Sequence, residues 1–477
     1  MGKIVMKFGG TSVQDTAAIR KVRDIVKATL EQGNKLPVVV VSAMAGVTDT
    51  LVRMSEKALE GRLEGSVGVL SDLRSLQTRH LSVLRDLFGN SGRLDAKFRG
   101  QGEADFNAAE AVIYERFGEL EGLVRSVATL RELTPRSQDA IISIGERLSS
   151  FLVANAFQGT INRELLDIDA RTFMITDDQF TCANPRMDEA KRFIHRALVT
   201  DMQMRGVPVT QGFIGATGDI RVRGTYTTTL GRGGSDYSAA IIGAAIGAEE
   251  IQIWTDVDGM LTADPRIVFS KARLVPQLTF VEAAELAYFG AKVLHPKTIQ
   301  PALEKGIPVR ILNSLNPKSP GTIISSERGD TNGPTAIACK RDVTVVDITS
   351  TRMLMAHGFL AKVFEVFARF KTAIDVVTTS EISVSVTIDD ASHLRQIAQE
   401  LEVFAQVETL PQMAILAVVG EQLPENPRLI GEILTLLGRF PIQLVSQSAA
   451  RRNLTVVLNN DDLPAVTVQL HEKFFPE

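Results

Sequence analysis

Two glycine-rich stretches of the sequence combine a flexible backbone with a cation, a combination that suits the binding of phosphate. The first, KFGGTS at residues 7–12, follows a short apolar run and precedes a predicted helix. Its glycines let the backbone approach a ligand, N–H groups at a helix start favour an anion, and Lys7 supplies a point charge. The Walker A pattern GxxxxGK[ST] is absent. Because a tight turn also explains a glycine pair, this motif alone does not decide between the two.

The second stretch, TTTLGRGGSD at residues 227–236, leads into an apolar helix predicted over residues 239–246. It offers three glycines, and Arg232 adds a forked donor for a carboxylate or a phosphate. Asp236, near the helix start, could be no more than a helix cap. Two phosphate-type loops on one sheet are harder to explain by turns than one loop is. The pair therefore favours an anion-binding site.

Other polar residues follow predicted strands, at the sheet edge where open α/β folds bind ligands. They lie in SAMAGVT (42–48), SIGER (143–147) and the pair Thr255–Asp256. Glu146 could pair with a neighbouring arginine, or it could hold the ammonium group of a substrate. In FGAKVLHP (289–296), Lys292 would be a second cation for a transferred phosphate. Solvated turns explain each of these strings equally well when taken singly.

Short apolar runs alternate with stretches of helical periodicity through the first two thirds of the chain. This alternation predicts an α/β fold with a mostly parallel sheet, whose nearly continuous hydrophobic runs are central strands. The predicted strands are residues 4–8, 38–41, 140–144, 207–214, 251–254 and 307–312. Between the second and third runs, the charged stretch 50–138 predicts several amphipathic helices that form a lid or an appended subdomain.

The last third of the chain repeats at an offset of 70 residues without a gap. Apolar positions coincide throughout, and both copies carry Arg-Phe at the end of the predicted helix, at 369–370 and 439–440. Each copy predicts a strand, a helix and two strands. The stretch 316–334, rich in proline, glycine and polar residues, is a plausible linker before the repeats.

Composition limits the class of protein. The 477 residues are 44% hydrophobic and 23% charged, which is typical of globular chains of two or three domains. A net charge of -4 argues against a nucleic-acid partner. Two cysteines are too few for a disulfide framework or a four-cysteine zinc site, and no run approaches the length of a membrane span. We expect a cytoplasmic protein with no membrane partner.

Taken in order, the motifs KFGGTSV, SAMAGVT, GER, TQGFIG, TTTLGRGGSDYSAA, WTDVDG, ADPR, FGAKVLHP and VTTSE resemble the aspartate kinases of the amino acid kinase superfamily. The resemblance spans essentially the whole chain and is to the monofunctional, lysine-sensitive type. It implies a three-layer αβα amino acid kinase fold with a mostly parallel sheet, followed by two α+β ACT (ferredoxin-like) modules. The implied domains are a catalytic domain (1–315), a linker (316–340) and ACT modules at 341–410 and 411–477 that could be intertwined.

The resemblance also implies a reaction and a site. The reaction is transfer of the γ-phosphoryl group of ATP to the β-carboxylate of L-aspartate with Mg²⁺, the first step towards lysine, threonine and methionine. No protein side chain is assigned to the metal. The implied catalytic residues are Lys7, Arg232 and Asp236, and those for aspartate are Thr48, Glu146, Phe213, Arg232, Gly233, Ser235 and Asp236. Those for ATP are Lys7, Phe8, Gly9, Gly10, Thr255, Asp256, Leu261, Arg266, Lys292 and Val293.

Feedback inhibition through the ACT modules, with L-lysine as the favoured effector, follows from the same resemblance. Because ACT sites form between modules of two subunits, a homodimer or larger homo-oligomer is implied. The implied effector residues are Met353, Ala356, Phe359, Leu360, Ala373, Ile374, Asp375, Ser380 and Glu381. Two positions depart from the pattern: Leu261 stands where relatives often have a tyrosine, and Ala373 replaces a small hydroxyl residue.

Two alternatives remain open at this point. One is a sibling kinase that acts on glutamate, acetylglutamate or UMP, which the paired C-terminal modules disfavour. The other is a catalytically silent ACT-type amino acid sensor, which retention of both glycine loops and both cations disfavours. A panel of substrates would distinguish the sibling kinase from an aspartate kinase, and a measurement of turnover would distinguish the silent sensor from an enzyme.

Overall fold

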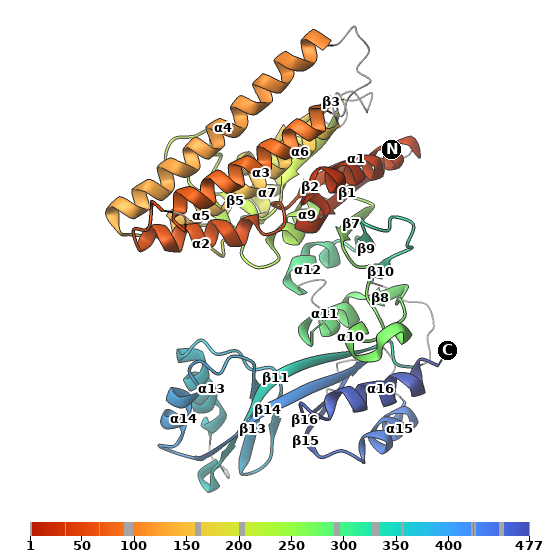
Figure 1. Ribbon diagram of the computed structural model, residues 1–477. Helices are drawn as coiled ribbons and strands as arrows, with labels where there is room; N and C mark the ends of the chain where they lie inside the picture. Colours follow the sequence, from red (N-terminus) through yellow and green to blue (C-terminus); the bar gives the residue numbers. More distant parts are fainter. Residues whose placement is uncertain are drawn as a thin grey trace. The chain divides into compact units, whose positions relative to one another are not determined.

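A computed structural model describes residues 2–33, 35–65, 67–89, 99–157, 164–199, 206–290, 296–326, 333–353, 357–420, 423, 426–447 and 453–476 (Figure 1). The chain forms two compact units. One consists of Met1–Gly259 with Leu294–Ser326, and the other of Met260–Val293 with Glu327–Glu477. Each unit is described by itself below.

The N-terminal unit contains a mostly parallel sheet. Its strands follow the order β3, β4, β2, β1, β7, β9, β10, and every neighbouring pair is parallel except β9 and β10. The strands are β1 (Gly2–Phe8), β2 (Lys35–Val41), β3 (Glu164–Ile168), β4 (Gly206–Gln211), β7 (Glu250–Thr255), β9 (Val309–Asn313) and β10 (Thr322–Ser325). The strands β5 (Ile214–Ala216) and β6 (Thr227–Thr229) form a separate antiparallel pair.

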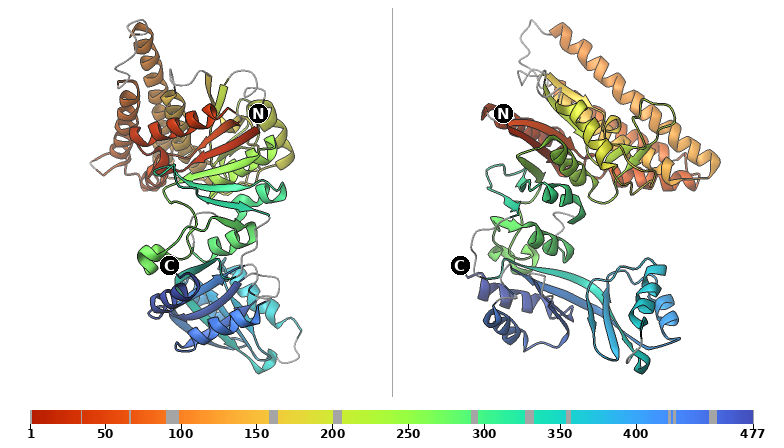
Figure 2. Two further views of the ribbon diagram at one scale, coloured as in Figure 1. Left: turned by 90° about the vertical axis from the view of Figure 1, so that its right-hand side faces the viewer. Right: turned by 180° about the vertical axis from the view of Figure 1, so that it is seen from behind.

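Helices cover both faces of this sheet, and the alternation of side chains along β1 separates the two layers. Ile4, Met6 and Phe8 belong to a core shared with the helices of one layer. Val5 faces the other layer, since it lies near Gly243 of α9. The first layer contains α1 (Thr16–Glu31), α2 (Val47–Leu59), α3 (Val69–Gly89), α4 (Arg99–Leu130) and α6 (Ile144–Ala156); the second contains α7 (Met187–Ile194), α9 (Gly234–Ile246) and α12 (Pro296–Glu304). The predicted three-layer αβα fold is confirmed (Figure 2).

Two predictions for this unit were wrong. The apolar run at residues 140–144 is helical: it ends α5 (Pro135–Ile142) and begins α6. A short apolar run has no periodicity to separate a strand from a buried helix segment, and Pro135 after the capping residue Thr134 was the available helix signal. The helices α2, α3 and α4 of the stretch 50–138 are not appended, because their apolar faces belong to the same core as the sheet.

The C-terminal unit contains a six-stranded antiparallel sheet in the order β12, β13, β11, β14, β16, β15. Its strands are β11 (Ala336–Thr349), β12 (Val377–Thr379), β13 (Ser383–Ile388), β14 (Gln406–Val419), β15 (Ile442–Gln447) and β16 (Asn453–Asn459). Its helices are α13 (Phe359–Arg369), α14 (Leu394–Leu401), α15 (Pro427–Leu437) and α16 (Leu463–Phe474). Both repeats therefore have the predicted strand, helix and two strands, each followed by a further helix. The paired ACT-type modules are confirmed.

The two long strands of this sheet pass from one repeat into the other. Ile337, early in β11, packs in the core of the second repeat, whereas Val346 and Ile348 pack in the core of the first. Both strands carry a residue with positive φ, Asp342 at 60° and Gln412 at 58°. These residues are seventy positions apart, so the irregularity repeats with the sequence. The beginning of β11 therefore belongs to the second repeat although it precedes the first repeat in the chain.

The segment before the predicted linker contributes to the C-terminal unit. Residues 260–293 contain α10 (Pro265–Val268), β8 (Gln277–Thr279) and α11 (Phe280–Tyr288). Ala263, Ile267 and Val268 share a core with the second repeat, which explains the grouping. The stretch 316–340 is not a plain linker, since it contains β10 and the start of β11.

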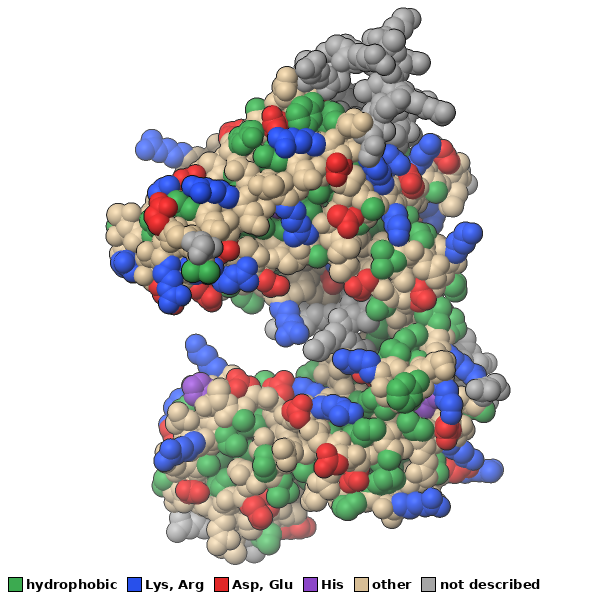
Figure 3. Space-filling model, viewed as in Figure 1, with side chains coloured by type: hydrophobic (Ala, Val, Ile, Leu, Met, Phe, Trp, Pro, Cys, Tyr) green, Lys and Arg blue, Asp and Glu red, His purple; other side chains and the backbone are tan. Residues whose placement is uncertain are grey.

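The surface carries mixed charge. On the face drawn in Figure 3, Lys and Arg side chains alternate with Asp and Glu on each unit, without a continuous basic area. Within the described ranges, no helix has the length and apolar character needed to cross a membrane.

Candidate active site

A cavity of about 530 Å³ lies in the N-terminal unit where β1 and β2 end and α9 begins. This is the carboxyl edge of the parallel strands, as predicted. It is lined by Lys7, Ser42, Thr48, Val52, Gln138, Asp139, Ile142, Glu146, Thr181, Phe213, Thr229, Gly231, Arg232, Gly233, Gly234, Ser235 and Asp236. Every residue that was predicted to hold aspartate lines this cavity.

Lys7 reaches the cavity because it alternates with Phe8 on β1 and so faces the α9 side of the sheet. Its Nζ atom lies 2.7 Å from Oδ1 of Asp236, in the first turn of α9. Both side chains are largely buried, which strengthens their attraction. Asp236 therefore fixes the ammonium of Lys7 at the cavity wall while leaving its remaining N–H donors for a ligand.

The first glycine pair has two distinct roles. A Cβ atom at Gly10 would lie 3.0 Å from the carbonyl oxygen of Ala43, so Gly10 permits close packing of two loops. The N–H of Gly9 donates to the carbonyl of Trp254 at 3.0 Å and is thereby used within the fold. Of this motif, Lys7 is the residue that lines the cavity, while both glycines serve contacts within the fold.

Glu146, near the start of α6, has a buried carboxylate of which only one oxygen accepts a hydrogen bond from a described residue. The side chain is only 3% exposed. Its Oε1 accepts the N–H of Ala43 at 3.2 Å, while Oε2 is buried with no hydrogen-bond partner among the described residues. Burial raises the pKa of Glu146 to about 8. A buried carboxylate of this kind is stabilised in its charged form only by an incoming cation, such as an ammonium group.

The second glycine loop holds Arg232 at the opening of the cavity. Gly231 and Gly233 have φ values of 73° and 72°, in the left-handed region that glycine adopts readily. Gly233 caps α9, and the exposed Arg232 forms no ion pair with any described residue. Its guanidinium is available to bind a carboxylate in a bidentate manner.

Phe213 is held in a strained conformation beside this loop. Its φ is 69°, which is unfavourable for an aromatic residue. The N–H of Phe213 donates to Ser238 Oγ at 3.0 Å, and its carbonyl accepts the N–H of Leu230 at 2.9 Å. Backbone strain fixed by surrounding bonds is typical of functional sites.

Nine residues that line the cavity were not among the predicted site residues: Ser42, Val52, Gln138, Asp139, Ile142, Thr181, Thr229, Gly231 and Gly234. Ser42 lies inside a motif that was singled out, but Asp139 and Thr181 do not. Asp139 is completely buried and binds Thr181 and Thr229 through hydrogen bonds. Asp139 directly precedes the run 140–144, which was predicted to be a strand, and no motif pointed to it.

The predicted nucleotide residues are divided between the two units. Thr255 and Asp256 end β7, next to β1, and the hydroxyl of Thr255 donates to Asp256 at 3.2 Å. Leu261 and Arg266 belong to the C-terminal unit, where Arg266 pairs with Asp264 at 2.6 Å. Lys292 and Val293 lie outside the described residues.

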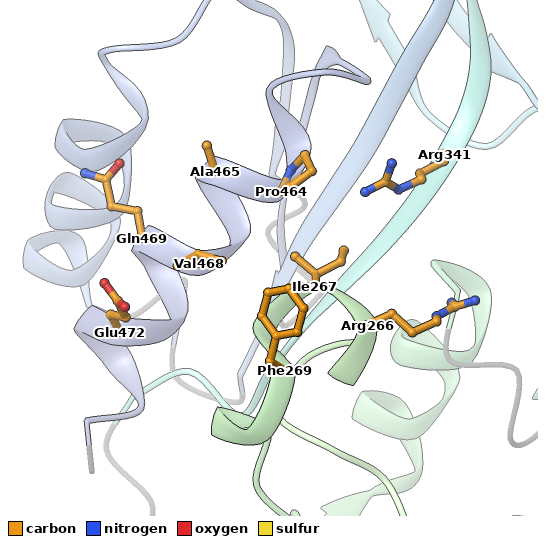
Figure 4. A pocket seen from close by; sticks show the side chains of 9 residues that line it. All are labelled: Arg266, Ile267, Phe269, Arg341, Pro464, Ala465, Val468, Gln469 and Glu472. Atoms are coloured by element: carbon orange, nitrogen blue, oxygen red, sulfur yellow. The ribbon is translucent and has the colours of Figure 1, made fainter.

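Arg266 lies on a second, smaller hollow of about 420 Å³ in the C-terminal unit (Figure 4). The hollow runs between α10 and α16 and is lined by Arg266, Ile267, Phe269, Arg341, Pro464, Ala465, Val468, Gln469 and Glu472. No polar side chain of this lining is deeply buried. In this respect the hollow differs from the cavity that Glu146 lines.

The predicted effector residues lie in the first repeat. Met353, Phe359 and Leu360 are at and before the start of α13, while Ala373, Ile374, Asp375, Ser380 and Glu381 flank β12. Asp375 is only 4% exposed and lies 2.8 Å from Lys340 Nζ. Ala356 lies outside the described residues.

Comparisons with known proteins identify the family of this chain. Residues 2–313 match the model of the amino acid kinase family. Aspartokinase 3, chloroplastic, from Arabidopsis thaliana is 38% identical over 99% of this chain and 81% of its own. Lysine-sensitive aspartokinase 3 from Escherichia coli is 34% identical over 99% of both chains.

Solved structures of aspartokinases match the fold over nearly the whole chain. E. coli aspartokinase III in complex with lysine and aspartate matches with a TM-score of 0.79 and 32% identity, over 99% of both chains. The same enzyme in complex with aspartate and ADP also gives a TM-score of 0.79, with 31% identity. On these grounds, the chain belongs to the amino acid kinase family and, within it, to the aspartokinases.

Proposed function

We propose that this protein is an aspartate kinase, which transfers the γ-phosphoryl group of ATP to the β-carboxylate of L-aspartate. The observation that carries the proposal is the unpartnered Oε2 of Glu146 inside the cavity. It calls for a cation, and Arg232 and Lys7 supply positive charge on the same cavity wall. An α-amino acid with a second carboxylate supplies one charged group for each of these side chains: an ammonium for Glu146, an α-carboxylate for Arg232 and a second carboxylate for Lys7.

The three contacts orient the substrate. Glu146 binds the ammonium, Arg232 binds the α-carboxylate, and the β-carboxylate then lies towards Lys7. An enzyme that pairs both α-groups rejects a substrate that lacks either one, because a buried charged group would be left unpaired. The reach from Arg232 to Lys7 selects aspartate over the longer glutamate.

The chemistry needs positioning and charge rather than a general base. A carboxylate is already ionised at neutral pH, so one of its oxygens attacks the γ-phosphorus directly. The bond from the γ-phosphorus to the bridging oxygen breaks, and ADP leaves with that electron pair. Lys7 lies where negative charge builds up on the transferred phosphoryl group, and Asp236 fixes its position.

A nucleotide substrate follows from membership of the family, and we propose that it arrives as MgATP. No group of three or more His, Cys, Asp or Glu side chains is placed to hold a metal within the described part of the chain. Mg²⁺ is held mainly by phosphate oxygens and water and needs few protein ligands. Mg²⁺ would therefore be carried by the nucleotide.

Regulation by L-lysine is proposed for the C-terminal unit, because the similar E. coli enzyme is lysine-sensitive. Asp375 is the buried carboxylate in the expected effector region, and in this structure Lys340 pairs with it. We further propose a cytoplasmic homodimer or larger homo-oligomer. Rate measurements with lysine and threonine added separately test the effector: inhibition by threonine alone would contradict lysine.

The test of the activity is an acyl-phosphate assay with MgATP and L-aspartate, in which hydroxylamine traps the product. L-Glutamate, N-acetyl-L-glutamate and succinate serve as comparison substrates. Glu146→Gln should raise the KM for aspartate far more than that for ATP and should narrow the preference for aspartate over succinate, which has no ammonium. Ligand binding without any turnover would instead support an amino acid sensor.

A further inference from the structure

Asp139, on α5, is a buried carboxylate that the proposed reaction does not use directly. It has no exposed surface, yet it lines the cavity. Three donors converge on it: Thr181 N–H at 2.9 Å and Thr229 N–H at 3.0 Å reach Oδ2, and the Thr229 hydroxyl reaches Oδ1 at 2.7 Å. Its partners lie 42 and 90 residues further along the chain. Asp139 thus joins three separate segments at one point.

Both partners control the glycine loop of the site. Thr229 is the last residue of β6, directly before the loop that carries Arg232. Thr181 has a φ of 71°, which is unfavourable for a residue with a branched side chain. A Cβ atom at Gly231 would lie 3.3 Å from the Thr181 carbonyl, so the Thr181 turn packs against the loop. Asp139 therefore stabilises both supports of the loop.

Asp139 is also directly connected to the ammonium-binding side of the cavity. α5, which carries it, ends at Ile142, and α6 with Glu146 starts at Ile144. The two carboxylates are thus on consecutive helices with one residue between them. A bond from Asp139 to Thr229 fixes the position of Arg232 relative to Glu146, the two groups that hold the α-carbon of the substrate.

We propose that Asp139 is a positioning residue that sets the spacing between the ammonium site at Glu146 and the carboxylate site at Arg232. This inference rests on the proposed function. Both oxygens of Asp139 accept hydrogen bonds. An asparagine at this position would turn its NH₂ group towards one or more of these donors and would lose the hydrogen bonds to them. The loop would then hold Arg232 and Ser235 less accurately, and small displacements of a substrate-holding group are costly for catalysis.

The test compares the KM values for aspartate and ATP in three variants. Asp139→Asn should raise the KM for aspartate at least tenfold while the KM for ATP changes less than about twofold. Thr229→Val, which removes only the hydroxyl donor, should raise it a few-fold and serves if Asp139→Asn does not fold. Ser149→Ala is the matched control, because Ser149 Oγ on α6 is equally buried but has no described partner. It should leave both KM values unchanged.

The outcomes separate this inference from the proposed function. A wild-type enzyme without turnover would overturn both. Wild-type turnover together with an unchanged KM for aspartate in Asp139→Asn and Thr229→Val, even at a lower melting temperature, would overturn the positioning role alone. An equal rise in both KM values would also overturn it, because a general loss of structure affects both substrates.

Discussion

The pH dependence of aspartate use offers the most direct test of Glu146. Burial raises its pKa to about 8, and only its ionised form can pair with the substrate ammonium. With that pKa, about nine sites in ten are ionised at pH 9 and about one in a hundred at pH 6. We therefore expect kcat/KM for aspartate to fall about 90-fold from pH 9 to pH 6, because protonation costs about 2.7 kcal/mol at the lower pH.

The assay measures initial rates of acyl-phosphate formation with saturating MgATP at half-unit steps of pH. At saturating MgATP, kcat/KM for aspartate reports ionisations of the enzyme form that binds aspartate, in which the aspartate site is empty and burial raises the pKa of Glu146. Aspartate keeps its ammonium and both carboxylates charged through nearly all of this range, so the substrate contributes little to the slope. The kcat/KM for ATP at saturating aspartate is measured in parallel and should not follow the same curve.

Glu146→Gln is the control for this experiment, because the amide keeps the shape and does not ionise. Its kcat/KM for aspartate should be low and nearly independent of pH. A flat profile for the wild-type enzyme would refute the reasoning. So would a wild-type slope that persists in Glu146→Gln, since another group would then be responsible.

Four further predictions concern stability and packing. The pKa of Glu146 is raised from 4.5 in the unfolded chain to about 8, so its ionisation destabilises the fold progressively between those pH values; Glu146→Gln should raise the melting temperature at pH 8.5 and have little effect at pH 4.5. Gly234→Ala places a Cβ atom 2.7 Å from the ring of Phe213 and should lower both activity and stability, by about 1–3 kcal/mol in unfolding free energy. Gly118→Ala in α4 has open space, so denaturant unfolding should show equal or greater stability. Lys340→Met removes the ammonium that lies within 2.9 Å of Asp375 and Asp389 and leaves the buried Asp375 without this partner. It should destabilise the C-terminal unit by about 1 kcal/mol, because Lys340 and Asp389 are partly exposed, and this should be seen as faster hydrogen exchange in β11 and β13; unchanged exchange would contradict the role of this pair.

The sequence was sufficient for features that depend on local chemistry. The two glycine loops, with Lys7 and Arg232, were identified because few residue types allow such loops, and the structure brings both to one cavity. The repeat of 70 residues was visible because both copies bury the same positions of one sheet and its helices.

What the sequence could not provide depends on contacts between distant segments. Asp139 is important through Thr181 and Thr229, and no local pattern reveals those partners. The run 140–144 is apolar because it is buried on several sides, and burial alone does not distinguish a helix from a strand. The grouping of α10 with the second repeat likewise results from packing of Ile267 and Val268 against a core built from residues more than sixty positions later.

The passage of β11 and β14 through both repeats has a consequence for how the C-terminal unit is made and broken. The second repeat contains a strand segment, Ala336–Lys340, that precedes the first repeat in the chain, whereas the core of the first repeat is built from described residues between 346 and 407. Truncation at residue 410 would remove β16 and the part of β14 that pairs with Ala336–Lys340, leaving that segment of β11 as an unprotected edge. The second repeat can therefore complete its sheet only after the first repeat and β16 have been synthesised, because its strands come from both sides of the first repeat in the chain.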